Sequence, residues 1–236
     1  MIATIILWLV GKYKTNQKQS APARGSAGSP MRFFRKKAIL ILIGMCLIGA
    51  VISQEQSLVY NVVYHGNQIG KMKVSQLKKG DDLYMKVNTN TSMRMILSIK
   101  VNQEEESHFR NGKMLYSTVK RSVNGKEKAN RHTVSAANGY QLDKEGKRAV
   151  GSQAPIIYNV HLLLRNEPSN LQKVYSDNYQ QYLSVEKLAE HKYRLKLPDG
   201  NYNIYYFRNG ICEALEINHS MYTLHIALET PMIAAN

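Results

Sequence analysis

The residues most able to do acid–base or metal chemistry lie in the run Glu104-Glu105-Glu106, with His108 two positions further on. Carboxylates beside an imidazole suit a hard-metal site or a proton-transfer site. Successive strand residues point to opposite faces, so Glu104, Glu106 and His108 would share one face. A metal site would need a further ligand from elsewhere in the chain. A solvated strand end before a tight turn is the plainer interpretation.

The remaining histidines give no stronger catalytic signal. His219 and His225 are six residues apart, which is about 20 Å along a strand, so they cannot bind one ion together. His161 lies on the flank of a predicted helix, where a structural hydrogen bond is the favoured interpretation over catalysis. The chain contains no H-E-x-x-H, no G-x-S-x-G and no phosphate-binding glycine loop. We therefore predict no catalytic residue, no metal site and no cofactor.

Tyrosines give the best indication of a function. Tyr202 and Tyr206 share one face of a predicted strand, and Tyr60 and Tyr64 share a face of the first strand. A curved sheet lined in this way could enclose an apolar ligand and orient it with a few polar groups. These four residues are our candidate ligand-binding residues. The alternative is that the same side chains fill a core.

Basic residues gather around one predicted hairpin. Lys120-Arg121 precede its Asn124-Gly125 turn, and Lys126, Lys128 and Arg131 follow it. Such a patch could attract anionic lipid headgroups or a cell-wall polymer. The alternative is a charged edge that discourages aggregation between strands. Nucleic acid is not an expected partner, because no aromatic and basic residues alternate as they do in a stacking platform.

An export signal precedes these elements. In the segment Met31–Ser53, basic residues are followed by the uncharged apolar run Ala38–Ile52, and cleavage is predicted between Ser53 and Gln54. The apolar run is shorter than the roughly 20 residues that span a bilayer. An uncleaved inner-membrane anchor is the alternative, and only then would the segment contact the membrane. In either case the rest of the chain is predicted to lie in the periplasm or cell envelope.

The segment divides the chain into three parts. Residues 1–30 have the composition of a disordered extension, residues 31–53 are the signal peptide or anchor, and residues 54–236 are predicted to form one exported domain. The first two parts hold 8 of the 32 Lys and Arg residues and none of the 17 Asp and Glu residues, so the domain is much less basic than the whole chain. Cys212 would be its single cysteine, expected to be buried and unreactive.

Period-two alternation predicts that this domain is mainly β. Leu58, Tyr60, Val62 and Tyr64 would share one strand face, and the alternating residues of 93–101 would share a face of another. Five dipeptides favour tight turns: Asn111-Gly112, Asn124-Gly125, Asn138-Gly139, Asp199-Gly200 and Asn209-Gly210. This pattern predicts an antiparallel meander. Residues 184–190 are also interpreted as a strand.

One helix is predicted near residues 155–165. Ser152 would cap it, Pro155 suits its first turn, and apolar residues then recur at helical spacing until Glu167-Pro168. An apolar stripe flanked by strands is expected to pack against the sheet.

The chain also resembles a known class. Its opening Val59–Tyr64 with Ile69-Gly70, the helical region Tyr158–Arg165 and the closing run Leu197–Gly210 are similar to exported domains of unknown function found in Bacteroidota, over about residues 58–228. The resemblance implies a periplasmic antiparallel β-domain, curved into a barrel or half-barrel, with one helix packed on or in it. It implies no catalytic residues.

Together these observations favour a noncatalytic binding domain of the cell envelope, for a hydrophobic or lipid-like ligand or for an anionic envelope component. The alternatives are a protein-interaction scaffold and, third, an enzyme that modifies lipid or cell-wall polymer. The oligomeric state is left open.

Overall fold

The structure is a computed structural model that describes residues 54–94 and 98–229. Within these ranges a 14-stranded sheet runs in the order β8-β7-β6-β5-β4-β3-β2-β1-β14-β13-β12-β11-β10-β9, and each pair of neighbours is antiparallel. The strands are β1 (Gln54–Tyr64), β2 (Asn67–Lys79), β3 (Asp82–Arg94), β4 (Ser98–Arg110), β5 (Lys113–Val123), β6 (Lys126–Ala136), β7 (Gly139–Lys144), β8 (Lys147–Val150), β9 (Lys173–Ser176), β10 (Gln181–Ala189), β11 (Lys192–Lys196), β12 (Tyr202–Arg208), β13 (Ile211–His219) and β14 (Tyr222–Leu228).

Tight turns join most of these strands. All five predicted turn dipeptides lie at junctions between consecutive strands. At Asn111-Gly112 the φ angles are 51° and 72°, and both residues occupy the left-handed region that a two-residue hairpin requires. His65-Gly66 and Glu145-Gly146 adopt the same conformation. These two turns were not predicted, because neither is an Asn-Gly or Asp-Gly dipeptide, the pairs that indicate such turns most clearly.

One predicted strand was wrong. Residues 93–101 do not form a single strand, because β3 ends at Arg94, β4 begins at Ser98, and Met93 faces Ile99 across the hairpin. The alternation misled because apolar residues occupy the same face on both arms and no turn dipeptide interrupts them. Residues 184–190 agree with the prediction, since β10 runs to Ala189.

The helix is shorter than predicted. α3 contains only Val160–Leu163, and its N-cap is Asn159 rather than Ser152. Asn159 Oδ1 accepts a hydrogen bond from the Leu162 amide at 3.2 Å. The preceding segment stays extended because its backbone bonds to the sheet: the Ile156 carbonyl accepts from the Met114 amide at 2.8 Å. Those groups are therefore not available for a longer helix.

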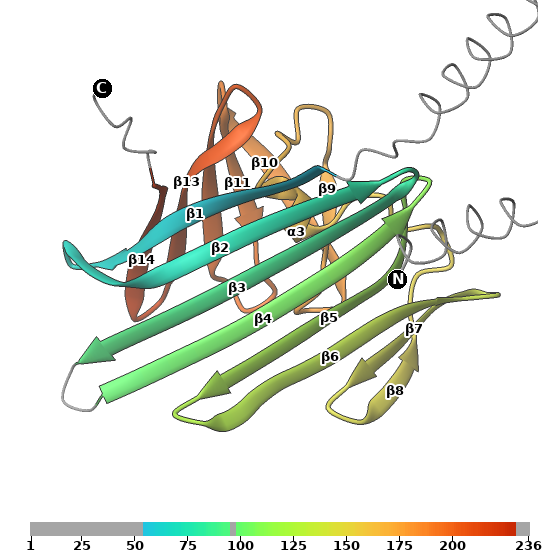
Figure 1. The fold of residues 1–236 in the computed structure, drawn as a ribbon, viewed down its shortest axis with the longest axis horizontal. Helices are drawn as coiled ribbons and strands as arrows, with labels where there is room; N and C mark the ends of the chain where they lie inside the picture. The colour runs from blue at the N-terminus through green and yellow to red at the C-terminus, as the bar shows by residue number, and fades with distance from the viewer. Residues whose placement is uncertain (1–53, 95–97, 230–236) are drawn as a thin grey trace, which may run out of the picture. The chain divides into compact units, whose positions relative to one another are not determined.

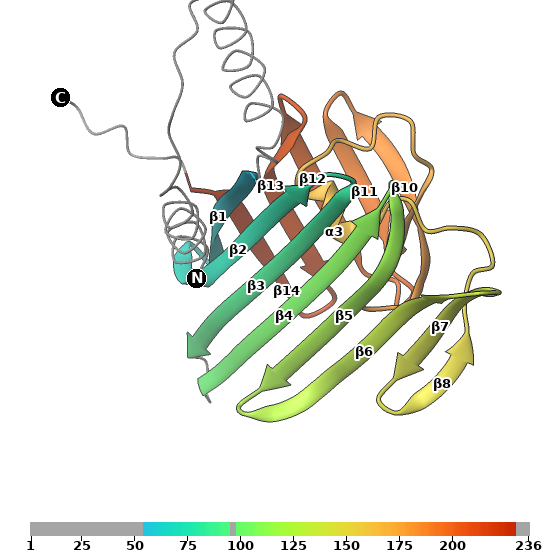
Figure 2. The ribbon, with the colours of Figure 1, turned by 45° about the vertical axis from the view of Figure 1, so that its right-hand side comes forward.

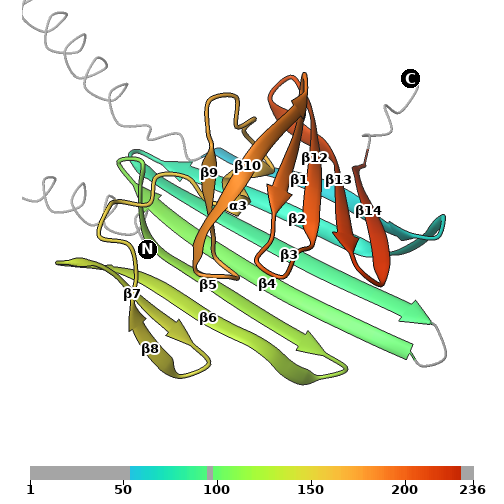
Figure 3. The same ribbon diagram turned by 180° about the vertical axis from the view of Figure 1, so that it is seen from behind.

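The sheet curves around its buried face. Register shifts in the β1–β2, β4–β5, β5–β6 and β12–β13 pairs introduce bulges, which bend strands and increase their twist. The views from opposite sides place α3 between strands β2–β5 and strands β9–β12 (Figures 1 and 3). The predicted curved antiparallel meander with one packed helix is thus confirmed.

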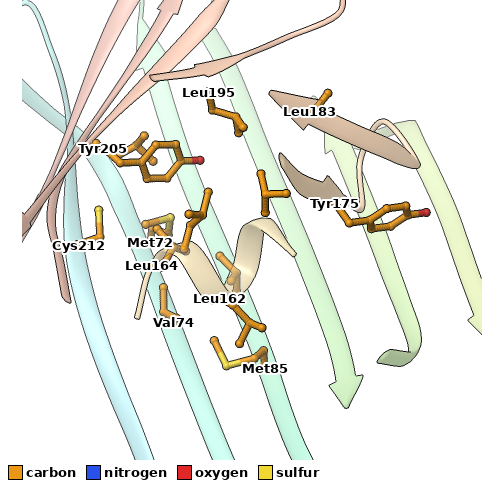
Figure 4. Packing of buried hydrophobic residues seen from close by; sticks show 14 of the residues in the cluster. Met72, Val74, Met85, Leu162, Leu164, Tyr175, Leu183, Leu195, Tyr205 and Cys212 are labelled. Atoms are coloured by element: carbon orange, nitrogen blue, oxygen red, sulfur yellow. The ribbon is translucent and has the colours of Figure 1, made fainter. Parts of the chain in front are cut away.

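The core fills the space between the helix and the two sides of the sheet. Met72, Val74 and Met85 extend from β2 and β3 toward two leucines (Figure 4). Leu162 lies in α3, and Leu164 is the C-cap of the helix. Other fully buried side chains come from β1, β4, β5, β9 and β11: Tyr60, Phe109, Met114, Tyr175 and Leu195.

Within the described ranges the sheet is not closed by strand pairing, since β8 and β9 are its edges. Side chains instead join its two sides along one line, which we call the seam. Gln180 Nε2 donates to the carbonyls of His132 at 2.9 Å and Asp143 at 3.2 Å, and Arg131 Nε donates to the Asn178 carbonyl at 2.8 Å. Figure 2 shows the two sides of the curved sheet and α3 lying between them.

The predicted signal segment, its cleavage site after Ser53 and residues 1–30 lie outside the described residues, so they stay predictions. Within the described ranges, no helix has the length and apolar character needed to cross a membrane.

Candidate functional site

A cavity of about 770 Å³ lies on the concave side of the sheet. Its size falls within the range of roughly 300–1,000 Å³ that small-molecule sites occupy. Apolar side chains from both sides of the sheet form much of its wall: Val62, Met72, Val87, Leu183, Leu195, Leu215, Leu224 and Ile226. These residues lie on inward faces because they alternate with outward-pointing polar residues along their strands.

Different elements line different parts of the cavity. Val160, His161 and Leu164, in and just after α3, line the part of the cavity that borders the helix. Tyr179, Asn201 and His219 also line the cavity, and they lie at or beside the β9–β10, β11–β12 and β13–β14 turns. In an antiparallel meander alternate turns fall at the same end. These turns therefore lie at one end of the sheet, and we call this end of the cavity the mouth.

Three ionisable side chains meet at the cavity wall: Glu105 from β4, His161 from α3 and Asp177, just after β9. We call them the buried triad. His161 Nε2 lies 2.5 Å from Glu105 Oε2 and 3.7 Å from Asp177 Oδ2. The His161 side chain is 2% exposed, that of Asp177 is 1% and that of Glu105 is 14%. Glu105 is therefore the member most accessible from the cavity.

The positions of these charges decide their protonation. Burial acts to lower the pKa of His161, but the charge of Asp177 and then the hydrogen bond and charge of Glu105 outweigh it and raise that pKa to about 9. Burial also acts to raise the pKa of Glu105, yet His161 holds it below its usual range. At neutral pH the pair is an imidazolium and a carboxylate. Burial raises the pKa of Asp177 against the opposing effect of His161.

Further hydrogen bonds fix the triad in place. The protonated Nδ1 of His161 donates to Ser107 Oγ at 3.0 Å. Asn159 Nδ2 donates to both Asp177 oxygens, at 3.1 and 3.0 Å, while its Oδ1 caps α3. One asparagine therefore ties the start of the helix to a buried carboxylate.

This arrangement suits a structural anchor better than a proton-transfer site. A general base needs a pKa near the working pH and a free lone pair, whereas His161 is protonated and both of its nitrogens donate to neighbours. Ser107 is 1% exposed and does not line the cavity, so it is not placed as a nucleophile. Among the described residues, no group of histidines, cysteines and carboxylates has the geometry to hold a metal ion.

The acidic run singled out in the sequence divides between two faces. Glu104 and Glu106 both bond to Lys86, the latter at 2.7 Å, and His108 bonds to Asp82 at 2.6 Å. Glu105 was left out of the group predicted to share one strand face, and it points inward to His161. Its parity matches that of Ile99 and Val101. A carboxylate on the same strand face as a row of apolar residues was the sequence feature that could have indicated a buried acidic group here.

The four candidate tyrosines do not line the cavity. Tyr60 is fully buried and donates to the Cys212 carbonyl at 2.8 Å, and Tyr64 packs on His65 at the first hairpin. Tyr202 and Tyr206 lie beside Arg194 and Lys192. Their ligand-binding role stays a prediction. The cavity is lined by three other tyrosines instead: Tyr179, Tyr205 and Tyr222.

His219 and His225 lie on two paired strands rather than along one strand. His219 ends β13 and stacks on Tyr222, which begins β14, at a centroid distance of 4.7 Å. His225 pairs with Glu216 across the same two strands. The 20 Å separation assumed for one extended strand does not apply, because a turn lies between them.

Polar groups also line the cavity. Asn178 Oδ1, Asn203 Oδ1 and Asn218 Nδ2 are buried atoms without a hydrogen-bond partner in the described part of the chain. Buried polar atoms are normally paired, so a ligand or a water molecule is expected to satisfy them. Arg121, Lys128, Arg131 and Lys144 add basic groups to the wall. Three of these belong to the hairpin that the sequence marked as basic.

Comparison with known proteins gives a family but no activity. A crystal structure described as a beta-barrel-like protein of domain of unknown function DUF1849 from Brucella abortus matches with a TM-score of 0.49 and 9% sequence identity, covering 77% of this chain and 98% of that chain. No curated protein matches the chain. The model of a domain of unknown function, DUF6134, matches residues 60–229. This match covers most of the curved sheet and the whole triad, and the chain therefore belongs to the DUF6134 family of domains of unknown function.

Proposed function

We propose that this chain is a noncatalytic binding protein of the bacterial cell envelope that holds a hydrophobic or lipid-like molecule inside its curved sheet. The cavity of about 770 Å³ is the observation that carries the proposal. Aliphatic side chains form much of its wall, and they favour an apolar ligand segment through the hydrophobic effect. The envelope setting and an origin in Bacteroidota rest on the sequence, through the export signal and the resemblance.

The packing of the wall supports a preformed site. Strands β1, β3 and β11 contribute Val62, Val87 and Leu195, which are at most 5% exposed. These side chains are held by the sheet on one side and face the cavity on the other. A ligand would therefore enter a space whose wall is already ordered, which reduces the entropy lost on binding.

An enzyme that acts on a lipid or polymer is the second candidate. The observation in its favour is that Glu105, His161 and Asp177, which are far apart in sequence, meet at the cavity wall. The protonated state of His161 and the bonding of both its nitrogens argue for binding instead.

Native mass spectrometry of the full chain, purified from its own envelope, tests the proposal. We expect a copurifying lipid-like molecule that is chemically intact. Thr89→Trp places a large side chain in the cavity, because Thr89 lines it from β3. The matched control is Asn90→Trp, since Asn90 is the next residue and is exposed.

We expect Thr89→Trp to lose the copurifying molecule and Asn90→Trp to keep it. Equal retention by both variants would refute binding in this cavity. A stoichiometric polypeptide in place of the lipid would support the scaffold alternative. Recovery of cleavage products would favour the enzyme.

A further inference from the structure

The basic side chains of the cavity wall differ in how they are used. Arg131 is engaged, because its Nη1 bonds to Glu145 Oε1 at 2.5 Å and its Nε bonds to the Asn178 carbonyl. By contrast, no hydrogen bond or ion pair within residues 54–94 and 98–229 holds the side chain of Arg121, Lys128 or Lys144. Three cations therefore face the cavity without a carboxylate partner of their own.

The acidic groups of the cavity already have partners. Glu105 bonds to His161, Asp177 accepts from Asn159, and Asp199 accepts from Tyr179 at 3.1 Å. Arg121 lies near enough to Glu105 to help lower the pKa of that carboxyl, but it makes no direct bond to it in the described structure. The cations thus keep free donors for a further anionic group.

The placement of the basic side chains on β6 and β7 carries an electrostatic cost. Arg131 and Lys144 lie directly opposite each other in the β6–β7 register, and within the described residues Glu145 forms an ion pair with Arg131 but not with Lys144. Like charges at opposed positions destabilise a sheet. An anion bound between the basic side chains would relieve this repulsion, and charge-assisted hydrogen bonds are among the strongest that proteins make.

We propose that Arg121, Lys128 and Lys144 recognise an anionic headgroup of the cavity's ligand, which is therefore an amphiphile that carries a carboxylate or a phosphate. This inference rests on the proposed function and specifies its ligand class. The basic residues lie toward the mouth, since Arg121 and Lys128 are close to the β5–β6 turn and Lys144 ends β7. The chain of the ligand then extends inward along the apolar wall that includes Val87 and Leu215.

Displacement of the neutral probe N-phenyl-1-naphthylamine from the full chain tests the inference. The competitors share a hexadecyl chain and differ in the headgroup: hexadecanoic acid, hexadecyl phosphate and hexadecanol. We expect the two anions to bind about tenfold or more tightly than the alcohol, as expected for a charge-assisted hydrogen bond. The preference should weaken as salt rises, because the cations near the mouth are partly exposed.

Arg121→Gln is the decisive variant, and Lys120→Gln is its matched control. Lys120 is the preceding residue on β5, is exposed and is absent from the cavity wall. We expect Arg121→Gln to bring acid and alcohol within about twofold of each other while alcohol binding is retained, and Lys120→Gln to preserve the difference.

The outcomes separate the two proposals. If probe and alcohol bind but the anions gain nothing, or if Arg121→Gln keeps the full preference, the headgroup site is refuted and the hydrophobic cavity stands. If neither the probe nor any competitor binds, the proposed function fails, and the headgroup site fails with it. Preference for the phosphate over the carboxylate, or the reverse, identifies which anion the site takes.

Discussion

The pair Glu104 and Glu105 allows a sharp test of the buried triad. The two residues are adjacent in β4 and face opposite sides of the sheet, with Glu104 on Lys86 at the surface and Glu105 on His161 in the interior. Replacing either one by Gln changes the same chemical group in the same strand. Only their environments differ.

The expected magnitudes follow from those environments. Breaking a buried pair leaves an uncompensated charge and costs roughly 3–5 kcal/mol, so we expect Glu105→Gln to lower the free energy of unfolding by about 3 kcal/mol. Glu104 is 48% exposed in its ion pair, and we expect Glu104→Gln to cost under about 1 kcal/mol.

The triad also predicts how stability depends on pH. The pKa of His161 is about 9 in the folded chain, against about 6.5 when unfolded. A raised pKa stabilises the fold fully below pH 6.5, and this stabilisation is lost as the pH rises through about 9. At about 1.36 kcal/mol per pH unit, the wild-type chain should lose up to about 3 kcal/mol across this window.

Guanidinium unfolding of the full chain at pH 6, 7, 8 and 9 measures both effects. We expect Glu104→Gln to follow the wild-type decline and Glu105→Gln to show a flatter one. Equal losses in the two variants would refute the argument. So would a wild-type stability that does not fall between pH 6.5 and 9, and this second result needs no variant to fold.

Three further predictions test other parts of the fold. Asn159→Ala removes the cap of α3 and a partner of Asp177, so it should lower the free energy of unfolding by about 3 kcal/mol. The control Asn166→Ala loses only a 3.4 Å hydrogen bond and should lower it by under about 1 kcal/mol. Equal losses would contradict the role of the cap. Gly70→Ala would place its Cβ 2.1 Å from the Asn90 carbonyl oxygen on the neighbouring strand. The midpoint of chemical unfolding should therefore fall by more for Gly70→Ala than for Gly66→Ala, because nothing lies within 4 Å of a Cβ at Gly66 and only its positive φ would be strained. Burial raises the pKa of the Cys212 thiol to about 12, so peptide mapping after iodoacetamide treatment at pH 8 should show Cys212 unmodified in the folded chain and modified in guanidinium; rapid labelling of the folded chain would contradict its burial.

Much of the fold could be predicted from local sequence. Two-residue hairpin turns require positive φ angles, and dipeptides such as Asn111-Gly112 adopt these angles readily, so the residue types alone indicate the turn. The hairpin between β3 and β4 was missed because its turn has no such dipeptide and its apolar alternation runs through both arms. The length of α3 was overestimated for a different reason: Ile156 bonds to β5, a contact that helical periodicity cannot anticipate.

The triad was harder to predict because its members come from three separate segments. His161 was assigned a structural hydrogen bond, and it makes one, but its partner Glu105 was treated as part of an exposed acidic run. Parity alone places Glu105 opposite Glu104, and only the three-dimensional path of the chain brings a helix to that face. The candidate tyrosines illustrate the same limit, since alternation shows which residues share a face but not which faces border a cavity.

The seam has a consequence for how this domain varies in size. In a closed barrel, strand number and stagger fix the radius, so the bore changes only in discrete steps. Here the two sides of the sheet meet through Gln180, Arg131 and their carbonyl partners rather than through a strand ladder. The spacing of the two sides along the seam therefore depends in part on the length of a few side chains, and point substitutions there can change it by small increments while the strand topology stays the same.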